Sequence, residues 1–467
     1  MMLQNASFQI MRPQWLDRWA DFAATITGEQ LPGDVVARTR QVLFDCIGAI
    51  AAGAQEPEMR RLTARLCHGS GDCAAPVIGT GCRAPVGIAA FLNGTAGTML
   101  EIDEGNQFAR GHPGIHVVPA VLAAAEELGS SGSDVLLAIA LGYEIGSRVG
   151  IASKLRVTMH PHGTWGTVGA AVAVAKLRNA TREQMAEVIN VSSTLGLATS
   201  RRTMLEGGTV RNSFAGFSNE IGLRAWEMVG AGFVGEADGI GTIYGTVIAD
   251  QFQPEEMIAE LGSRWEITRN YFKRHAACRY NHGALDALHN LIAKAGGHLK
   301  PDDIAQIDVD TYVWAAQLDA PKPRNMLAAK FSLPFSLATA IVNGAASIAA
   351  FRDEARRDAV TLALAGRVTV REDKVFTAML PGLRPARVKI TLVDGRVLCA
   401  EAFTNKGDAE DPYSAEEIRD KFREVAGSVW GDAHCLVILE AVENLDRSAD
   451  LGALSRLLAV RSGGHHV

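Results

Sequence analysis

The chain has 467 residues, of which 48% are hydrophobic and 21% charged, and its formal net charge is −6. These values are ordinary for a globular protein with large buried cores, and the length suggests about two or three domains. The acidic balance, together with the lack of a long basic run, argues against a nucleic-acid-binding protein.

The cysteines and the N-terminus bear on the cellular compartment. Seven cysteines are scattered along the chain with no CxxC pair, which is typical of reduced thiols in a cytoplasmic protein. The N-terminal residues lack the apolar segment of a secretion leader, and no uninterrupted apolar run is long enough to cross a bilayer. We therefore expect a soluble cytoplasmic protein with no membrane partner.

The pattern from about residue 15 to residue 270 predicts helices almost throughout. Apolar residues recur every three or four positions over 35–53, and the small-residue run 87–100 is typical of a helix packed closely against another. Thr181 and Gln184 form a capping-box pattern ahead of a further apolar run. We expect this region to form an all-helical domain.

After about residue 271 the pattern changes to short strands mixed with helices. Polar and apolar residues alternate over 305–313, 367–373 and 386–403. The last of these segments contains a Val-Asp-Gly-Arg turn, which is typical of a hairpin. This part of the chain therefore predicts an α+β domain.

The C-terminal region returns to the helical pattern, beginning with a capping box at Ser414 and Glu417. The predicted fold class is mainly α. A large all-helical domain is built from both chain ends, residues 1–270 and 408–467, and a smaller α+β domain, residues 271–407, is inserted between them.

The segment 101–119 interrupts the packing pattern between two apolar helices. It holds three carboxylates within four residues, Glu101, Asp103 and Glu104, and then a glycine-punctuated interval that leads to a His-Pro-Gly motif at His112. A polar segment dense in titratable groups between buried helices is where a protein commonly carries out chemistry. We take it as one wall of a candidate active site.

Four of the twelve histidines lie in loops marked by proline or glycine: His112, His160, His162 and His282. Histidine is readily tuned for proton transfer near neutral pH, so these loops could converge on one cleft. A metal site is the competing interpretation, because His160 and His162 form an H-x-H pair. No third ligand follows at a recognised spacing and H-E-x-x-H is absent, so we expect no metal.

Cationic residues gather in two segments near these histidines. They are Arg201, Arg202 and Arg211 in the first and Lys273, Arg274 and Arg279 in the second. In an acidic protein such clusters favour a small anionic substrate bound by bidentate arginine contacts. A solvated basic face or ion pairs within the fold would give the same pattern, so charge alone leaves both interpretations open.

Residues 230–235, GAGFVG, match the dinucleotide pattern G-x-G-x-x-G without its context. That motif requires a strand, a tight turn and a helix in this order, whereas here a helical run precedes it and no helical pattern follows. We interpret it as a glycine-rich loop and expect no cofactor.

Five segments, taken in order, resemble the MmgE/PrpD family. They are the acidic cluster followed by HPG, MHPHGTWGTVGAA, TVRNSFAGFSNEIG, FKRHAACRYNHGALDA and AAKFSLPFSLATAIVNG. The resemblance extends from about residue 43 to about residue 412. It implies a large helical domain with a smaller α+β lid, an active site in the cleft between them, homodimers, no metal requirement and a small polycarboxylate substrate.

The resemblance also assigns residues to the site. Matched by position, the family's acidic residues are Glu101 and Asp103, its loop histidines are His112 and His160, and its lid-entry histidine is His282. Arg211 stands where a family decarboxylase has a lysine, and because arginine stays protonated it can stabilise negative charge but is a poor base. Phe335 stands where that decarboxylase has a tyrosine. Both departures weaken a decarboxylase assignment.

The resulting hypothesis is an enzyme that forms a carbanion next to a carboxylate. Substrate binding is assigned to Arg211, to Glu101 and to Lys273 or Lys330, and the cations would stabilise an enolate-like intermediate. His112 or His160 would move the α-proton, oriented by Asp103. A second histidine, with His282 among the catalytic candidates, would protonate the leaving hydroxyl. We expect Glu104 and His116 to lie behind the site or at the surface.

A hydro-lyase is the favoured reaction because it needs only this acid/base pair and no decarboxylase-specific tyrosine. An epimerase or isomerase, which would use the same groups on opposite faces of the substrate, and a decarboxylase of a related polycarboxylate are the alternatives. A catalytically silent protein that binds polycarboxylates is the third alternative. The substrate, its stereochemistry and the division of acid and base roles between the histidines are left open.

Overall fold

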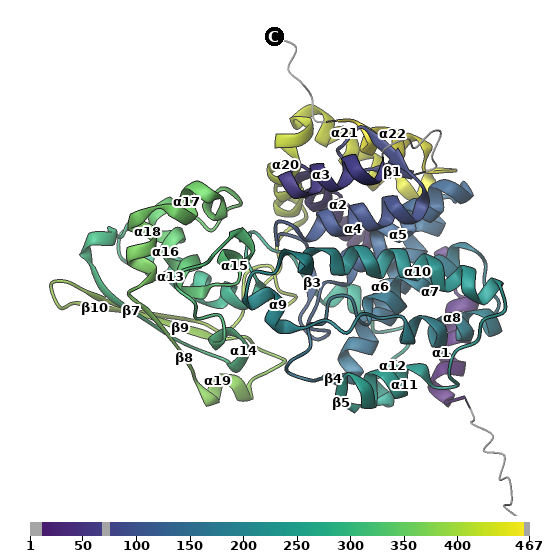
Figure 1. Ribbon diagram of the computed structural model, residues 1–467, viewed down its shortest axis with the longest axis horizontal. Helices are drawn as coiled ribbons and strands as arrows, with labels where there is room; N and C mark the ends of the chain where they lie inside the picture. Colours follow the sequence, from purple (N-terminus) through teal and green to yellow (C-terminus); the bar gives the residue numbers. More distant parts are fainter. Residues whose placement is uncertain (1–11, 68–74, 462–467) are drawn as a thin grey trace, which may run out of the picture.

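The structure is a computed structural model that describes residues 12–67 and 75–461. Within these residues the protein is mainly α-helical, as predicted, with one four-stranded and three two-stranded sheets. Figure 1 shows a large helical lobe and a smaller lobe that carries the four-stranded sheet. Residues 1–11, on which part of the expectation about a leader rests, lie outside the described residues.

Six helices form the core of the helical lobe: α2 (Gly33–Gly53), α4 (Val86–Thr98), α5 (Pro113–Leu128), α6 (Gly132–Ala152), α7 (Gly166–Leu177) and α10 (Ser213–Gly230). Small residues permit their close approach, since a Cβ on Gly142 of α6 would lie 2.6 Å from the backbone oxygen of Gly169 on α7. The helices predicted over 35–53 and 87–100 are confirmed.

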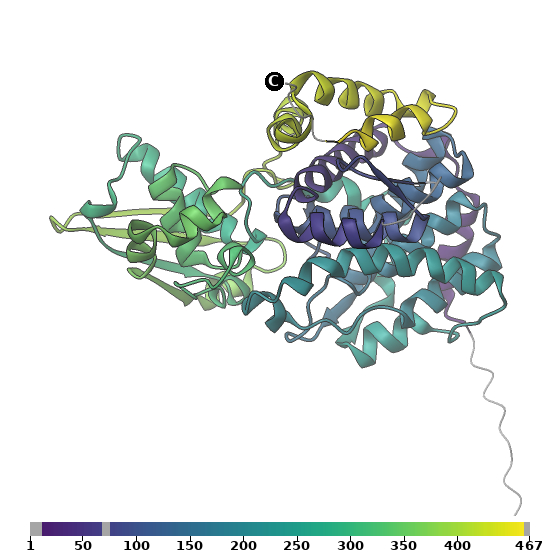
Figure 2. The ribbon, with the colours of Figure 1, turned by 45° about the horizontal axis from the view of Figure 1, so that its top comes forward.

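Helices from both ends of the chain pack on this core. They are α1 (Gln14–Thr25), which contacts α8 (Arg182–Thr194), and the C-terminal helices α20 (Ala415–Trp430), α21 (Asp432–Glu443) and α22 (Gly452–Ala459). Figure 2 shows the C-terminal helices stacked beside α2. Lys421 of α20 donates to Asp45 of α2 over 2.5 Å and to the backbone oxygen of Ile102 over 2.7 Å, so α20 is tied directly to the acidic segment.

The predicted local signals at helix ends are confirmed. Thr181 and Gln184 exchange hydrogen bonds at the start of α8, and Ser414 and Glu417 do so at the start of α20. Residues 230–235 form the end of α10 and the irregular segment after it, as expected for a glycine-rich loop.

The four-stranded sheet confirms the predicted strands. Its order is β10 (Val397–Ala402), β9 (Ala386–Leu392), β7 (Ile304–Thr311) and β8 (Val368–Glu372), with β7 and β8 parallel and the other pairs antiparallel. Helices α13 (His282–Lys294) and α16 (Leu333–Asn343) pack against this sheet. Strand β7 buries alternate residues, including Ile307 and Val309, which explains the alternation seen in the sequence.

The helical lobe is not purely helical, so that part of the prediction is wrong. Three short antiparallel pairs close loops in it: β1 (Ala75–Val77) with β2 (Cys82–Ala84), β4 (Ser153–Leu155) with β5 (Ala249–Phe252), and β3 (Gly105–Asn106) with β6 (Asn270–Tyr271). Strands of two to four residues carry too little alternation to be recognised in a sequence. The β3–β6 pair joins the acidic segment to the start of the sheet lobe.

The sequence predicted no apolar run long enough to span a bilayer, and helix α6 is an exception. Its 21 residues are long and apolar enough by length and composition, but 94% of its most apolar stretch is buried inside the fold. Such burial is that of a core helix, and among the described residues α6 is the one helix that meets those two conditions.

Candidate active site

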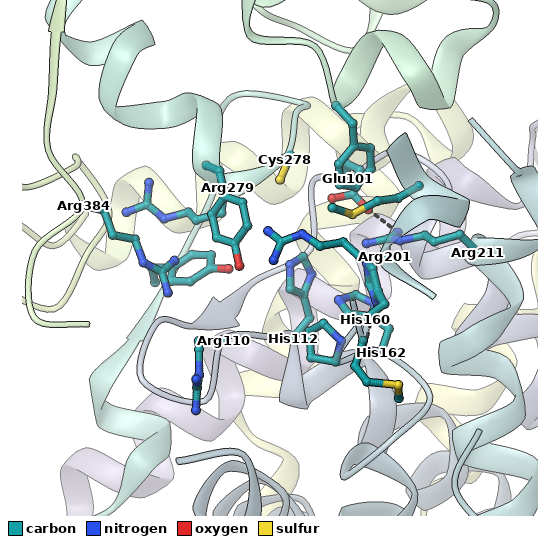
Figure 3. Close-up of a pocket in the computed structure, with 16 residues that line it drawn as sticks. Glu101, Arg110, His112, His160, His162, Arg201, Arg211, Cys278, Arg279 and Arg384 are labelled. Carbon is teal, nitrogen blue, oxygen red and sulfur yellow. Dashed lines mark hydrogen bonds and ion pairs between the residues drawn. The ribbon is translucent and has the colours of Figure 1, made fainter. Parts of the chain in front are cut away.

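A cavity of about 50 Å³ lies between residues of the two lobes (Figure 3). Its charged and titratable lining residues are Glu101, Arg110, His112, His160, His162, Arg201, Arg211, Tyr271, Cys278, Arg279, Tyr280 and Arg384. Pockets for small molecules commonly have about 300–1,000 Å³. The space between these side chains is therefore smaller than that of a typical small-molecule pocket.

His112 and Asp103 form a hydrogen-bonded pair beside this cavity. His112 is the N-cap residue of α5, and its Nδ1 lies 2.6 Å from Oδ2 of the buried Asp103. Burial opposes ionisation of the carboxyl, but His112 and Lys273 together outweigh it and hold the pKa of Asp103 below its usual value. Burial lowers the pKa of His112 in spite of the neighbouring carboxylate. Near neutral pH the pair is a neutral imidazole beside a carboxylate.

Cations behind this pair keep the carboxylates ionised. Glu101 forms an ion pair with Arg211, and Nζ of Lys273 lies 3.8 Å from Glu101 and 3.6 Å from Asp103. Burial opposes ionisation of Glu101 as well, yet Arg211 and Lys273 hold its pKa below the usual value. Glu101 has a φ of +53°, a conformation that residues other than glycine rarely adopt, so the backbone is strained where this carboxylate meets Arg211.

The loop between β4 and α7 contributes His160 and His162. The hydroxyl of Thr199 donates to the backbone oxygens of His160 and His162 over 2.7 Å and 2.9 Å, which fixes the loop. The backbone N–H of His162 donates to Nδ1 of His160 over 3.1 Å. Burial, followed by the charge of Arg211, lowers the pKa of both histidines well below the usual value. His160 is therefore neutral with Nδ1 as an acceptor, which leaves its proton on Nε2.

His116 and Glu104 lie behind the site, and the alternative that they lie at the surface is wrong, because each is at most 1% exposed. Nδ1 of His116 lies 2.8 Å from the backbone oxygen of His112, and its Nε2 accepts from the backbone N–H of Gly163 over 3.3 Å. Glu104 accepts from the backbone N–H of Gly114 over 2.9 Å, and burial raises its pKa to about 8. These two residues connect the loops that carry His112 and His160.

Four predicted site residues do not line the cavity: Asp103, Lys273, Lys330 and His282. Lys273 lies behind the two carboxylates, and Nζ of Lys330 donates to the backbone oxygen of Leu100 over 2.6 Å. Burial lowers the pKa of Lys330 to about 7. Nε2 of His282, at the start of α13, lies 3.3 Å from the backbone oxygen of Ala277. Glu101, His112, His160 and Arg211 are brought together at the cavity, with Asp103 directly behind His112.

Sequence reasoning missed five of the charged and titratable lining residues: Arg110, Tyr271, Cys278, Tyr280 and Arg384. Arg110 stands two positions before His112, and its nearness to that motif was a usable signal. Tyr271 reaches the site because β6 pairs with β3, opposite Gly105. Arg384 precedes β9 with no motif nearby, so only the folded arrangement places it at the cavity.

The histidines that could bind a metal pack against one another in this site. In the described ranges, 12–67 and 75–461, no three His, Cys, Asp or Glu side chains form a group that could hold a metal ion. The rings of His112 and His160 meet the ring of His162 edge to face, with centroids 4.6 Å and 4.7 Å away. The expectation of a metal-independent reaction stays a prediction.

The fold and the site together define a mainly α-helical protein with a buried histidine–carboxylate pair beside a cavity lined by arginines. The family model of the MmgE/PrpD N-terminal domain matches residues 17–249, and that of the MmgE/PrpD C-terminal domain matches residues 275–447. The chain belongs to the MmgE/PrpD family, as its motifs predicted.

Relatives with assigned names align along almost the whole chain. The cis-aconitate decarboxylase of Aspergillus terreus is 26% identical over 94% of this chain and 94% of its own length. The cis-aconitate decarboxylase-like protein oryM of Aspergillus oryzae is 27% identical over 93% and 94%, and the cis-aconitate decarboxylase of Mus musculus 23% over 94% and 92%. The relatives support a lyase-type activity without specifying its mechanism.

Proposed function

We propose that this protein is a metal-independent hydro-lyase that removes water from a small hydroxy-polycarboxylate through a carbanion next to a carboxylate. The observation that carries the proposal is the Asp103–His112 pair, because His112 lines a cavity rich in arginine. Membership of the MmgE/PrpD family supports a lyase of this kind. The relatives named cis-aconitate decarboxylase support it as well, because aconitate is an acid with a carbon–carbon double bond.

His112 is the base in this proposal. Its Nδ1 proton is donated to Asp103, so Nε2 is left unprotonated for the cavity. The lowered pKa of His112 keeps that nitrogen free near neutral pH, and Asp103 stabilises the imidazolium formed when the α-proton is taken. Asp103 acts as the orienting group, as the sequence predicted.

His160 is the hydrogen-bond donor to the leaving hydroxyl. Because its Nδ1 accepts the N–H of His162, the neutral ring carries its proton on Nε2. Because this ring is already neutral, its Nε2–H acts as a hydrogen-bond donor to the leaving hydroxyl, and the proton that completes the departing water comes from the imidazolium formed at His112 or from solvent. The hydrogen bonds of the two histidines thus give them opposite tautomers and opposite roles.

Arg211 stabilises the carboxylate on which negative charge develops. Its guanidinium is held by Glu101 on one side, and its Nε has no hydrogen-bond partner in the described structure. A fixed cation at the position of an enolate lowers the barrier to α-proton removal, because the charge is already oriented before the reaction. Lys273 and Lys330 support Glu101 from behind and do not bind the substrate themselves in this proposal.

Dehydration and decarboxylation differ in whether they need a base that removes a proton. Decarboxylation needs a proton donor after CO₂ departs but no proton abstraction, so the Asp103–His112 pair would have to act as an acid, which the lowered pKa of His112 disfavours near neutral pH. Phe335, expected to mark the difference, packs against Phe351 with ring centroids 5.9 Å apart and does not line the cavity. Its identity therefore does not bear directly on the chemistry. A cis-aconitate decarboxylase-type reaction is the second candidate, favoured by the names of the relatives.

We also propose that the sheet lobe acts as a lid, with domain boundaries near residues 271 and 407. The backbone N–H of Phe272 donates to the oxygen of Gly407 over 3.1 Å, so the two crossing segments lie side by side, as a hinge requires. His282, which begins α13 after the first crossing, is then a structural residue of the lid. We also propose a cytoplasmic homodimer: the location rests on the scattered cysteines and the dimer on the family resemblance alone. Light scattering of the purified protein tests the dimer.

The reaction is tested by incubating the purified protein with hydroxy-, unsaturated and imino-polycarboxylates in deuterium oxide and reading the products by NMR. A hydro-lyase forms an alkene from a hydroxy acid, or hydrates the alkene, with one deuterium incorporated. Release of CO₂ from an unsaturated tricarboxylate would replace the proposal by the decarboxylase. Exchange at the α-carbon without loss of water would identify an epimerase, and binding without turnover a silent protein.

A further inference from the structure

Three arginines of the cavity lining have guanidinium nitrogens that no group of the described protein satisfies. They are Nε and Nη2 of Arg201, Nε and Nη1 of Arg279, and Nε of Arg384. Arg279 and Arg384 are each only 3% exposed. A buried cationic donor without a partner is costly, so a set of them around one cavity indicates that an anionic group fills the space between them.

The charges of these arginines, named here the arginine wall, are poorly balanced by the protein. Arg279 forms an ion pair with Asp408, and Arg384 donates one bond to the backbone oxygen of Gln107 over 2.5 Å. Within residues 12–67 and 75–461, the side chain of Arg201 makes no hydrogen bond or ion pair. The wall therefore retains net positive charge that an incoming anion would neutralise.

Two tyrosine rings arrange the wall and connect it to the catalytic pair. The guanidinium carbons of Arg201 and Arg384 lie 5.5 Å and 5.6 Å from the ring centre of Tyr280. That of Arg279 lies 4.7 Å from the ring centre of Tyr271, and this ring lies 6.4 Å from the ring of His112. Figure 3 shows Arg279 and Arg384 on one side of the cavity and Arg211 on the other, with His112 and Arg201 between them.

We infer that the arginine wall is a second carboxylate subsite, separate from Arg211, which holds a carboxylate remote from the reacting carbon. The inference rests on the proposed function for the position of that carbon. Arg211, on the opposite side of His112, binds the carboxylate where charge develops, and the planar forks of the wall suit bidentate binding of another. The substrate then carries at least two carboxylates, and Arg201 is the specificity-determining residue, because of the three arginines it is the one whose side chain has neither an ion pair nor a hydrogen bond in the described structure.

The subsite also connects the two lobes. Arg201 begins α9 (Arg201–Leu205) of the helical lobe, whereas Arg279 and Arg384 belong to the sheet lobe. A carboxylate shared among them bridges the lobes, so binding of the second carboxylate favours the closed arrangement. A ligand with a single carboxylate, held by Arg211 alone, makes no such bridge.

Calorimetric titration with unreactive acids tests the subsite independently of turnover. The probes are butyrate, glutarate and tricarballylate, which carry one, two and three carboxylates, and inorganic phosphate. The full-length protein is compared with Arg201→Met and with Arg202→Met, a matched control whose side chain is 82% exposed and paired with Glu206. Since the loss of a hydrogen bond to a charged group costs roughly 10- to 100-fold in affinity, Arg201→Met is expected to weaken tricarballylate and glutarate by this factor. Butyrate binding and the Arg202→Met variant are expected to be unchanged.

The outcomes separate the subsite from the chemistry. Equal weakening of butyrate and tricarballylate, or no weakening of either, overturns the inference, and so does Arg201-dependent binding of phosphate that is tighter than binding of glutarate. If Arg201→Met does not fold, Arg384→Gln in the same titrations serves the same purpose. Should no polycarboxylate be turned over, a preserved preference for tricarballylate that depends on Arg201 still supports the subsite while the proposed lyase activity fails.

Discussion

The two sides of the cavity differ in how their charges are balanced. The side named here the histidine wall consists of Glu101, Asp103, His112, His160 and Arg211. Its carboxylates are matched by Arg211 and Lys273, and its histidines are neutral. The arginine wall keeps charged nitrogens without partners. The charges of the histidine wall are paired within the protein, although Nε of Arg211 has no hydrogen-bond partner, whereas Arg201 and Arg384 of the arginine wall have no counter-charge in the described structure.

This difference separates chemistry from recognition. Catalytic groups need fixed protonation states and orientations before the substrate binds, which a network of internal partners supplies. Groups that recognise an anion need donors that the protein leaves unused, at a cost that the ligand relieves on binding. Substitutions on the histidine wall should therefore change kcat, and substitutions on the arginine wall should change KM.

The largest expected effect is loss of the base. His112→Gln and Asp103→Asn are each expected to lower kcat by roughly 10²- to 10⁴-fold, as is typical when general acid/base catalysis is removed. Steady-state kinetics on the substrate found in the NMR screen measures this loss. Tricarballylate should bind both variants with little change, because the arginine wall is intact. His289→Gln, an exposed histidine on α13, is the control, and wild-type turnover by His112→Gln would remove the catalytic assignment.

Most residues of the histidine wall could be selected as candidates from the sequence. The acidic segment, the His-Pro-Gly motif and the H-x-H pair are compact and polar between apolar helices, so Asp103, His112 and His160 stood out from their neighbours. The helices and the hairpin were readable because their periodicity extends over many residues. Two-residue strands such as β3 and β6 were not, although their pairing brings Tyr271 to the site.

The arginine wall was only partly predictable. Arg201 and Arg279 appeared in cationic clusters, where the sequence could not distinguish a ligand site from ion pairs. Arg384 had no local signal, because its position depends on how the sheet lobe meets the helical lobe. The sequence predicted Lys273 and Lys330 at the substrate because of their charge. In the fold both are buried behind the cavity, where Lys273 lies near the carboxylates and Lys330 donates to a backbone oxygen. Which partner a buried cation finds is a property of the fold.

Stability provides the next test, with opposite expectations for the two walls. Glu101→Gln leaves Arg211 and Lys273 with less buried counter-charge, and breaking a buried pair in this way commonly costs about 3–5 kcal/mol. Arg201→Met removes a cation that has no counter-charge, so the ligand-free protein should unfold at an equal or higher urea concentration than wild type. Equilibrium urea unfolding measures both variants. A destabilised Arg201→Met protein with a normal Glu101→Gln protein would reverse the comparison.

The pH dependence of kcat/KM tests the state of His112. The base must be unprotonated, and burial lowers its pKa below the ordinary 6.5. Activity should therefore stay level as pH falls toward 6.5 and decrease only below that value, where His112 gains a proton. Asp103 raises the pKa of His112, so in Asp103→Asn the acid limb of the residual activity should move to lower pH. An acid limb above pH 6.5 in wild type would contradict the proposed neutral pair.

The smallest expected effect is that of metal removal. The proposed reaction takes its base from His112, the hydrogen-bond donor to the leaving hydroxyl from His160 and its charge stabilisation from Arg211, so no step calls on a metal ion. Protein treated with a chelator and then passed through a desalting column should keep its kcat and KM within experimental error, and added zinc or magnesium should not raise them. Activity that is lost on chelation and restored by one metal would show that the histidine wall binds a metal ion. The difference in charge balance between the two walls would then not separate acid/base catalysis from substrate recognition.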